Sequence, residues 1–321
     1  MKAVFCHLVI FVVVKARIYK STGSWYLAKG EDGAFYQARA RGVFKVDGIT
    51  STNPIAVGDE VEMMMEEVEE QSAVITAIGD RKNYVARQSP HNKHQHHIIA
   101  SNLDQSMLLV TLISPRTSQG FIDRFLVSSA SFHIPAILVF NKSDLYRKKE
   151  MALFERYREI YEAAGYPVYL ISVQERTGLE PVRELLAHRT TLLSGHSGVG
   201  KSSFINALFP DFNLRTSEVS DWSGKGLHTT TFAEMFDLPE EGSLIDTPGL
   251  REFGLVDISR QELSHYFPEM LRLLPDCRYN DCMHINESDC AVKFGLIDGK
   301  VSEERYISYR TILDSMPEKS Y

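Results

Sequence analysis

The sequence predicts an α/β protein in three parts: an N-terminal β-barrel, a central parallel sheet covered by helices, and a helical C-terminal region built around a cysteine cluster. Short strand-like segments separated by glycine turns fill the region from about Ile18 to Arg87. Buried-strand and helix patterns alternate from Leu103, and three of the four cysteines lie between Cys277 and Cys290. A chain of 321 residues is long enough for two or three such domains.

The composition is that of a globular protein with sizeable cores, because 44% of the residues are hydrophobic and 24% are charged. The net charge of −7 does not indicate a nucleic-acid-binding protein. Net charge excludes little in a chain of several domains, however, since a local basic face can still dock on phosphate.

The N-terminus is apolar from Ala3 to Val14, which is too short to span a bilayer. A signal peptide needs a small-residue cleavage site, and the sequence from Lys15 to Arg17 does not offer one. We therefore expect residues 1–17 to be an apolar extension, such as a tail from an upstream start codon, or a first strand. No other apolar run reaches eighteen residues, so we expect a cytoplasmic protein without a membrane partner.

Residues 18–100 predict a small β-barrel, for which an OB-fold is the economical choice. The clearest strands are Ser24–Leu27, Ala34–Ala40 and Ala73–Ile78, and turn sequences such as Asp32-Gly33 separate them. The acidic run Glu60–Glu70 predicts a solvated strand and loop.

A histidine-rich stretch, His91–His97, ends this region. It is either a basic segment that faces RNA or a polar linker whose histidines are mostly neutral at pH 7. A metal site is a third interpretation.

Residues 101–254 alternate between buried strands and helices, which predicts a parallel sheet covered on both faces. The predicted strands are 107–112, 136–140, 167–172, 191–194, 232–236 and 243–245, and the predicted helices are 121–131, 150–164, 179–188 and 203–208.

Residues Gly195–Ser202 match the phosphate loop G-x-x-x-x-G-K-[ST], between an apolar strand and a helix. Glycines let backbone N–H groups approach phosphates, and the helix N-terminus adds a positive dipole. We expect Lys201 to reach the β- and γ-phosphates and Ser202 to bind Mg²⁺.

Asp246–Gly249 follows a strand and matches the D-x-x-G motif of GTP-binding domains. Asp246 is expected to hold Mg²⁺ through water, and the Gly249 N–H to contact the γ-phosphate. In the stretch His228–Thr231, Thr230 is the favoured further Mg²⁺ ligand and Thr229 the alternative.

Asn141–Asp144 reads N-K-S-D, the guanine-specificity motif N-K-x-D, directly after a buried strand. The Asp144 carboxylate can accept from guanine N1 and N2, Lys142 packs along the base, and Asn141 braces the loops. This motif precedes the phosphate loop, whereas it follows it in ordinary GTPases, so the domain is predicted to be a circularly permuted P-loop GTPase domain. A P-loop ATPase or kinase is disfavoured by this motif.

Two departures from the usual pattern stand out. Ser172-Val173-Gln174 occupies the place of the usual S-A-K, where backbone N–H groups contact guanine O6. Leu250 follows the D-x-x-G motif, where Ras-like GTPases carry a water-orienting glutamine. We therefore expect slow intrinsic hydrolysis and activation by a partner, with His228 as the candidate water-orienting residue or simply a solvent-facing loop histidine.

The candidate catalytic residues are His228 and Lys201, and the candidate Mg²⁺ ligands are Ser202, Thr230 and Asp246. The candidate GTP-binding residues are Asn141, Lys142, Ser143, Asp144, Ser172, Val173, Gly195, His196, Ser197, Gly198, Val199, Gly200, Lys201, Ser202, Ser203 and Gly249.

Cys277, Cys282, His284 and Cys290 form the pattern C-x₄-C-x-H-x₅-C. Three thiolates and one imidazole suit tetrahedral Zn²⁺ in a closed, structural site, which leaves no position for a water nucleophile. The alternative is a cluster of reduced thiols in a core. We expect residues 255–321 to form a helical zinc-binding domain that ends in a helix near 301–316.

From about Ile18 to the C-terminus, the chain resembles the ribosome small-subunit-dependent GTPase A family (RsgA, or YjeQ). The resemblance rests on NKSD, the later GHSGVGKS, GKGLHTTT, DTPGL and CRYNDCMHINESDC. It implies an N-terminal OB-fold, a permuted GTPase domain and a C-terminal zinc domain. Leu227 departs from the family, which often has a basic residue there, and this weakens the expectation that its loop grips RNA.

The resemblance also implies GTP hydrolysis stimulated by the small (30S) ribosomal subunit late in its maturation, with rRNA contacts by the OB-fold and the zinc domain. We expect a monomer that binds GTP and GDP. The alternative is a nucleotide-gated rRNA-binding checkpoint in which hydrolysis is incidental.

Overall fold

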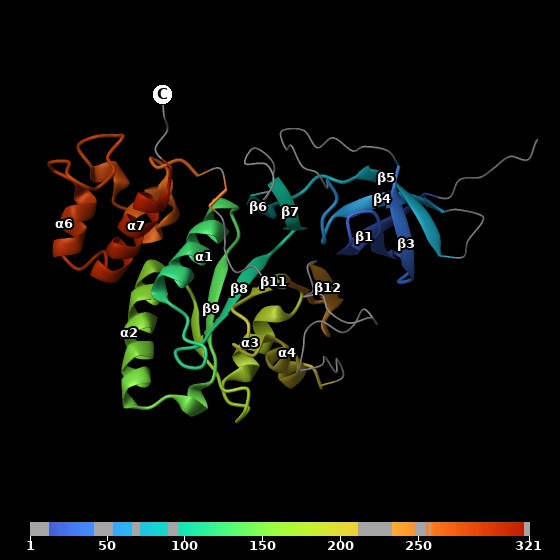
Figure 1. Cartoon of the computed structure of the whole chain (residues 1–321), viewed down its shortest axis with the longest axis horizontal. Coiled ribbons are helices and arrows are strands. Elements are labelled where there is room, and N and C mark those ends of the chain that lie inside the picture. Colours follow the sequence, from blue (N-terminus) through green and yellow to red (C-terminus); the bar gives the residue numbers. More distant parts are fainter. Residues whose placement is uncertain are drawn as a thin grey trace, which may run out of the picture.

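The computed structural model describes residues 13–41, 54–65, 71–88, 96–210, 233–247, 255–256 and 258–317. A barrel, a central sheet with its helices, and a group of C-terminal helices follow one another across the molecule (Figure 1). Within these residues, no helix is long and apolar enough to cross a membrane.

The barrel is a closed, five-stranded, OB-like β-barrel, as predicted. Its strands follow the order β1-β2-β3-β5-β4, and β4 pairs back with β1 to close it. The strands are β1 (Val13–Ser21), β2 (Tyr26–Gly30), β3 (Phe35–Ala40), β4 (Glu60–Met65) and β5 (Ser72–Ile78). Alternating residues such as Ile18, Met63 and Ile75 point inward and are fully buried, which is why these segments pair as strands around a core.

A two-stranded hairpin, β6 (Tyr84–Gln88) and β7 (His96–Ser101), follows the barrel. The linker interpretation of 91–97 is therefore wrong for His96 and His97, which lie in β7, while residues 91–95 lie outside the described part of the chain. The hairpin is held in place because Val85 and Ala100 are buried in one apolar cluster with Tyr19 of the barrel and Met235 of the central sheet.

The central sheet has the order β10-β9-β8-β11-β13-β12, and all its pairs are parallel except β12 with β13. Its strands are β8 (Gln105–Val110), β9 (Ala136–Phe140), β10 (Val168–Leu170), β11 (Thr190–Ser194), β12 (Glu234–Asp237) and β13 (Ser243–Asp246). Its helices are α1 (Gln119–Ser131), η1 (Ser143–Leu145), α2 (Lys148–Ala164), α3 (Leu179–Leu186) and α4 (Lys201–Leu208). One apolar core lies under α1 and α2 and a second under α3 and α4, so both faces are covered as predicted.

The barrel and the central sheet share their strands. β1 pairs with β12, so that one continuous eleven-stranded sheet runs from the barrel into the central domain. Tyr19 and Met235 are buried together in an apolar cluster at this junction. Lys20 and Lys29 from the barrel form ion pairs with Glu234 and Asp237 of β12.

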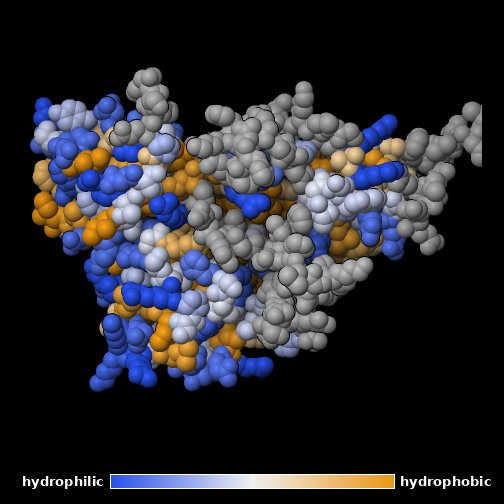
Figure 2. Space-filling view, in the orientation of Figure 1, coloured by the Kyte–Doolittle hydropathy of each residue, from blue (hydrophilic) through white to orange (hydrophobic). Residues whose placement is uncertain are grey.

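The C-terminal region consists of short helices around an apolar core. They are η3 (Leu263–Tyr266), α5 (Pro268–Leu271), η4 (Leu274–Asp276), α6 (Ala291–Ile297) and α7 (Glu303–Ser315). The Ser302 side chain caps α7 by accepting from the Arg305 N–H. Figure 2 shows apolar surface at the end of the molecule where α6 lies, and there Phe294 and Ile297 are 56% and 81% exposed.

A buried ionic cluster joins α5 and α7 of this region to α1 and α2 of the central domain. The Arg305 guanidinium donates to Glu269 Oε1 at 2.6 Å and to Asp123 Oδ1 at 2.7 Å, and it stacks on the Phe267 ring. Tyr161 on α2 donates to the same Asp123 oxygen. These contacts hold α7 against the central domain.

Candidate functional site

The phosphate loop lies between β11 and α4, at the carboxyl end of the central strands, where α/β sheets usually bind ligands. Gly195, Gly198 and Gly200 have φ angles of +147°, +82° and +99°. A Cβ on Gly195 would lie 2.4 Å from the Leu109 carbonyl oxygen, so this position needs glycine. The loop therefore packs tightly against the end of β8, in a backbone conformation that requires glycine.

Lys201 begins α4 and points back over the loop. Its Nζ donates to the carbonyl oxygen of Gly195 at 2.7 Å and lies 3.4 Å from that of His196. Burial lowers the pKa of Lys201, and the charge of Asp246 partly opposes this shift. The same two residues interact from the other side: burial raises the pKa of Asp246, and Lys201 lowers it.

Asp246 ends β13, and its Oδ1 is buried without a hydrogen-bond partner among the described residues. The next residue, Thr247, has a buried hydroxyl in the same condition. A carboxylate oxygen beside a phosphate loop, with Ser202 on the neighbouring helix, is the hard-oxygen donor set that Mg²⁺ prefers. The residues present therefore fit a Mg²⁺ ion.

Asn141 connects three loops. Its Nδ2 donates to the Val199 carbonyl oxygen at 2.9 Å, and its Oδ1 accepts from the Val173 N–H at 3.2 Å. A Cβ on Gly200 would lie 2.8 Å from the same Nδ2, so glycine also makes room for this bridge. One side chain thus ties N-K-S-D, the phosphate loop and S-V-Q together.

The other residues of N-K-S-D line the same edge. Lys142 has a left-handed backbone, with φ of +66°, and its Nζ donates to the Gly198 carbonyl oxygen at 2.8 Å. The Asp144 carboxylate accepts a hydrogen bond from the Ser172 hydroxyl. Ser143 begins η1, and its N–H donates to the Ile171 carbonyl oxygen.

Two residues near this site were not predicted from the sequence. Phe121 on α1 stacks on His196 of the phosphate loop, with 3.9 Å between the ring centroids. Tyr146 donates to the Asn141 carbonyl oxygen and accepts from the Leu112 N–H. No motif marks these residues, because aromatic residues in such patterns usually belong to a core.

Several predicted site residues cannot be placed. His228, Thr229, Thr230, Gly249 and Leu250 lie outside the described residues. The structure brings together the described members of the predicted GTP site, from Asn141 to Asp144, Ser172 and Val173, and the whole phosphate loop through Ser203.

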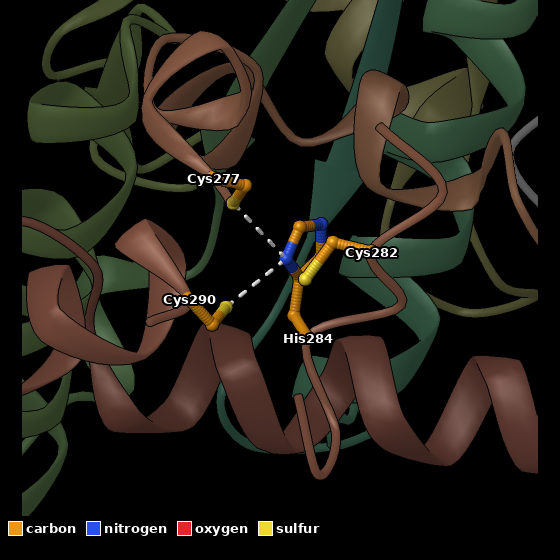
Figure 3. A group of neighbouring side chains, drawn as sticks. All are labelled: Cys277, Cys282, His284 and Cys290. Carbon is orange, nitrogen blue, oxygen red and sulfur yellow. Dashed lines mark hydrogen bonds between the residues drawn. The ribbon is translucent and has the colours of Figure 1, made fainter. Parts of the chain in front are cut away.

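The second site is the cluster Cys277, Cys282, His284 and Cys290 (Figure 3). One ligand atom from each residue lies within 4.8 Å of the others. His284 Nδ1 lies 3.3 Å from Cys290 Sγ and 3.7 Å from Cys277 Sγ, so this nitrogen faces the sulfurs. His284 and Cys290 are buried at 0% and 2% exposure. The arrangement is a closed Cys₃His set compatible with a metal ion.

The loop that carries the cluster is fixed by its surroundings. Tyr306 and Tyr309 on α7 donate to the carbonyl oxygens of His284 and Met283, and the Glu287 carboxylate accepts from the N–H groups of Met283 and Ile285. Burial raises the pKa of the Cys282 thiol to about 12. A metal ion bound at this site would have to displace that proton.

Comparison with known proteins gives matches along almost the whole chain. The RsgA N-terminal domain family matches residues 15–75, and the RsgA GTPase family matches residues 78–256. The small ribosomal subunit biogenesis GTPase RsgA of Christiangramia forsetii is 47% identical over 302 residues, with 94% of this chain and 96% of that protein covered. The protein of the same name from Cytophaga hutchinsonii is 49% identical over 300 residues, with 94% and 98% covered.

Two solved structures are similar. YjeQ from Thermotoga maritima superposes with a TM-score of 0.75 at 30% identity, covering 94% of this chain and 98% of that chain. YloQ, described as a circularly permuted GTPase, gives a TM-score of 0.72 at 28% identity, covering 98% and 100%.

Proposed function

The chain belongs to the RsgA GTPase family and is a circularly permuted, GTP-hydrolysing enzyme, and from this premise we propose that it acts in the maturation of the small (30S) ribosomal subunit. The observation that carries the proposal is the relationship at 47% identity over nearly the full length of a small ribosomal subunit biogenesis GTPase. The phosphate loop and the guanine motif are intact in this chain.

GTP occupies the edge formed by the phosphate loop, N-K-S-D and S-V-Q. The backbone of Gly195–Ser203 cradles the phosphates, Asp144 selects guanine, and the Ser172 and Val173 segment faces its O6. Gly249 contacts the γ-phosphate. The support for this assignment is the bridge that Asn141 makes between all three loops.

Ser202, Thr230 and Asp246 would hold Mg²⁺, which would supply charge neutralisation on the β- and γ-phosphates. Lys201 places its ammonium on the same phosphates once it leaves the Gly195 and His196 carbonyl oxygens. His228 orients the attacking water, because Leu250 cannot do so by hydrogen bonding.

Zn²⁺ is the metal of the Cys₃His cluster, and its role is structural. The three thiolates and the imidazole would provide four protein ligands, which would leave no position for substrate or water. The buried thiols and the tyrosine-held loop support a site that is part of the domain's core.

The protein is a cytoplasmic monomer whose barrel and zinc domain contact rRNA. We divide the chain into an extension or first strand at 1–17, an OB-fold at 18–100, the GTPase domain at 101–254 and the zinc domain at 255–321. β1 begins at Val13, which favours the first-strand interpretation for the end of the extension.

The test is GTP hydrolysis by the purified protein with and without small ribosomal subunits, with Lys201→Ala as the blank. Strong stimulation by the subunit is expected. Binding to the subunit without stimulation would instead favour the rRNA-binding checkpoint, for which Leu250 in place of a water-orienting glutamine is the motivating observation. If the protein neither binds the subunit nor is stimulated by it, the assignment of the partner is refuted.

A further inference from the structure

A row of charged residues crosses from the barrel to the nucleotide site. Lys20 of β1 is directly opposite Glu234 of β12, and Glu234 is directly opposite Asp246 of β13. Residues opposite one another on neighbouring strands present their side chains on the same face of a sheet. Three charged side chains from three strands therefore lie side by side on one face.

The charges in this row are arranged so that each carboxylate has a lysine as a neighbour. Lys20 Nζ lies 3.1 Å from Glu234 Oε2, and both side chains are more than two-thirds buried, at 29% and 17% exposure. Asp246 is opposite Leu193 of β11, the strand that leads into the phosphate loop and Lys201, and the charge of Lys201 acts on Asp246. The order is thus positive, negative, negative, positive, with a lysine on the outer side of each carboxylate. Two like charges directly opposite are unfavourable unless they are compensated.

We propose that Lys20 and Glu234 are positioning residues for the nucleotide site, in which the barrel's Lys20 holds and neutralises the Glu234 carboxylate so that Asp246 and Lys201 serve the Mg²⁺ ion and the phosphates. The inference rests on the proposed roles of Asp246 and Lys201. The physical reason is charge: GTP brings several negative charges, so an unneutralised Glu234 beside Asp246 opposes its binding. The way the barrel sits on β12 therefore sets the affinity of the GTPase domain for nucleotide.

The other end of β12 provides a matched control. Asp237 accepts from Lys29 Nζ at 2.6 Å and from the Tyr19 hydroxyl, and it is opposite Ser243 rather than Asp246. The Lys29–Asp237 pair is therefore a second ion pair between barrel and β12 that does not lie beside the nucleotide site. A variant of Lys29 therefore tests docking of the barrel without changing the charges of Lys20, Glu234 and Asp246.

The experiment is equilibrium binding of a fluorescent, non-hydrolysable GTP analogue at saturating Mg²⁺. Lys20→Met is expected to weaken binding about fivefold, a discounted value because the pair is partly exposed. Lys20→Met combined with Glu234→Gln is expected to bind within about twofold of the wild type, because the carboxylate that Lys20 neutralises is gone. Glu234→Gln alone is expected to bind no more weakly than the wild type, and Lys29→Met to bind like it.

Equal weakening in Lys20→Met and in the double variant would overturn the proposal, since the charge of Glu234 would then be irrelevant. Equal weakening in Lys29→Met would also overturn it, because docking of the barrel alone would explain the effect. If Lys20→Met unfolds at a clearly lower temperature, the deciding variant is the charge swap Lys20→Glu with Glu234→Lys, which keeps the ion pair. Binding of the analogue at least as tight as in the wild type supports the proposal. Weaker binding overturns it.

Asp246→Asn and Lys201→Ala separate this inference from the proposed function. If both variants lose binding while Lys20→Met keeps it, the positioning role of Lys20 and Glu234 is refuted and the assignment of the nucleotide site stands. If both bind the analogue like the wild type, the assignment of the nucleotide site itself fails, and the inference fails with it.

Discussion

Replacing Arg305 by alanine should release the C-terminal domain from the GTPase domain. Arg305 is 1% exposed and is the cation for two carboxylates, Asp123 and Glu269, which are 0% and 5% exposed. Its guanidinium also stacks 4.5 Å from the centroid of the Phe267 ring. The substitution removes the positive charge and leaves both carboxylates buried.

The expected loss is about 3–5 kcal/mol, because removing one partner of a buried ion pair leaves an uncompensated buried charge. The loss should depend on pH. Burial already raises the pKa of Asp123, and Arg305 lowers it, so in the variant this pKa rises further. A group with a raised folded-state pKa loses stability as pH increases from its unfolded pKa to its folded pKa. The variant should therefore be closer to the wild type at pH 5 than at pH 8.

The assay is hydrogen exchange of α7 and α1 at increasing urea, which reports the stability of this junction rather than of the whole chain. Combining Arg305→Ala with Asp123→Asn and Glu269→Gln is the matched control, and it should recover most of the loss because no buried charge remains. A loss below about 1 kcal/mol, equal at both pH values, would refute the reasoning that buried charge dominates this junction.

Four other changes test the remaining sites. Cys290→Ser should abolish zinc retention after dialysis, as measured by atomic emission, and unfold the C-terminal helices, since metal binding in small zinc domains is worth about 10–16 kcal/mol; retained zinc would contradict the assignment. Asn141→Ala removes a bridge between three loops and should weaken binding of a GTP analogue about tenfold by fluorescence titration; unchanged affinity would count against the bridge. Gly200→Ala places a Cβ 2.8 Å from an amide nitrogen at a φ of +99°, and should lower stability by about 1–2 kcal/mol in urea unfolding; a stable variant would show that the loop can shift. The hydrogen bond from Arg156 lowers the pKa of Glu304, so this pair should stabilise the fold above the ordinary glutamate pKa and lose that effect as pH falls through the lowered value. Glu304→Gln should therefore cost less than about 1 kcal/mol at pH 7 and progressively less as the pH falls through the lowered pKa, and a larger cost at low pH would contradict this.

Sequence patterns predicted the sheet well because its strands are short apolar runs between helices. The strand predicted at 107–112 in fact begins at Gln105 and ends at Val110. Periodicity missed its start because Gln105 and Ser106 are polar, yet both are buried: the Gln105 amide donates to Thr191 Oγ1, and the Ser106 hydroxyl to Ser129 Oγ. Such pairs satisfy each other only in the folded chain.

The candidate sites were also predictable where a local motif marks them and not where distant segments meet. The cysteine and histidine spacing predicted the Cys₃His cluster, and the motifs N-K-S-D, G-x-x-x-x-G-K-S and D-x-x-G predicted one GTP site. No local pattern could indicate that Lys20 lies beside Glu234 or that Arg305 reaches Asp123, because these contacts join distant segments of the chain. Their residues are common surface types, and only tertiary packing buries them.

The β1–β12 pairing has a consequence for synthesis of the chain. The five strands of the barrel all lie between residues 13 and 78, so this domain can close while the rest is still being translated. Its partner strand arrives much later, since Lys20 and Glu234 are 214 residues apart. During that interval the edge of β1 that will pair with β12 is unpaired, and open strand edges can pair with other chains. Emergence of β12 both completes the interdomain sheet and removes this risk, so a ribosome that stalls within the GTPase domain would leave this part of β1 open to other chains.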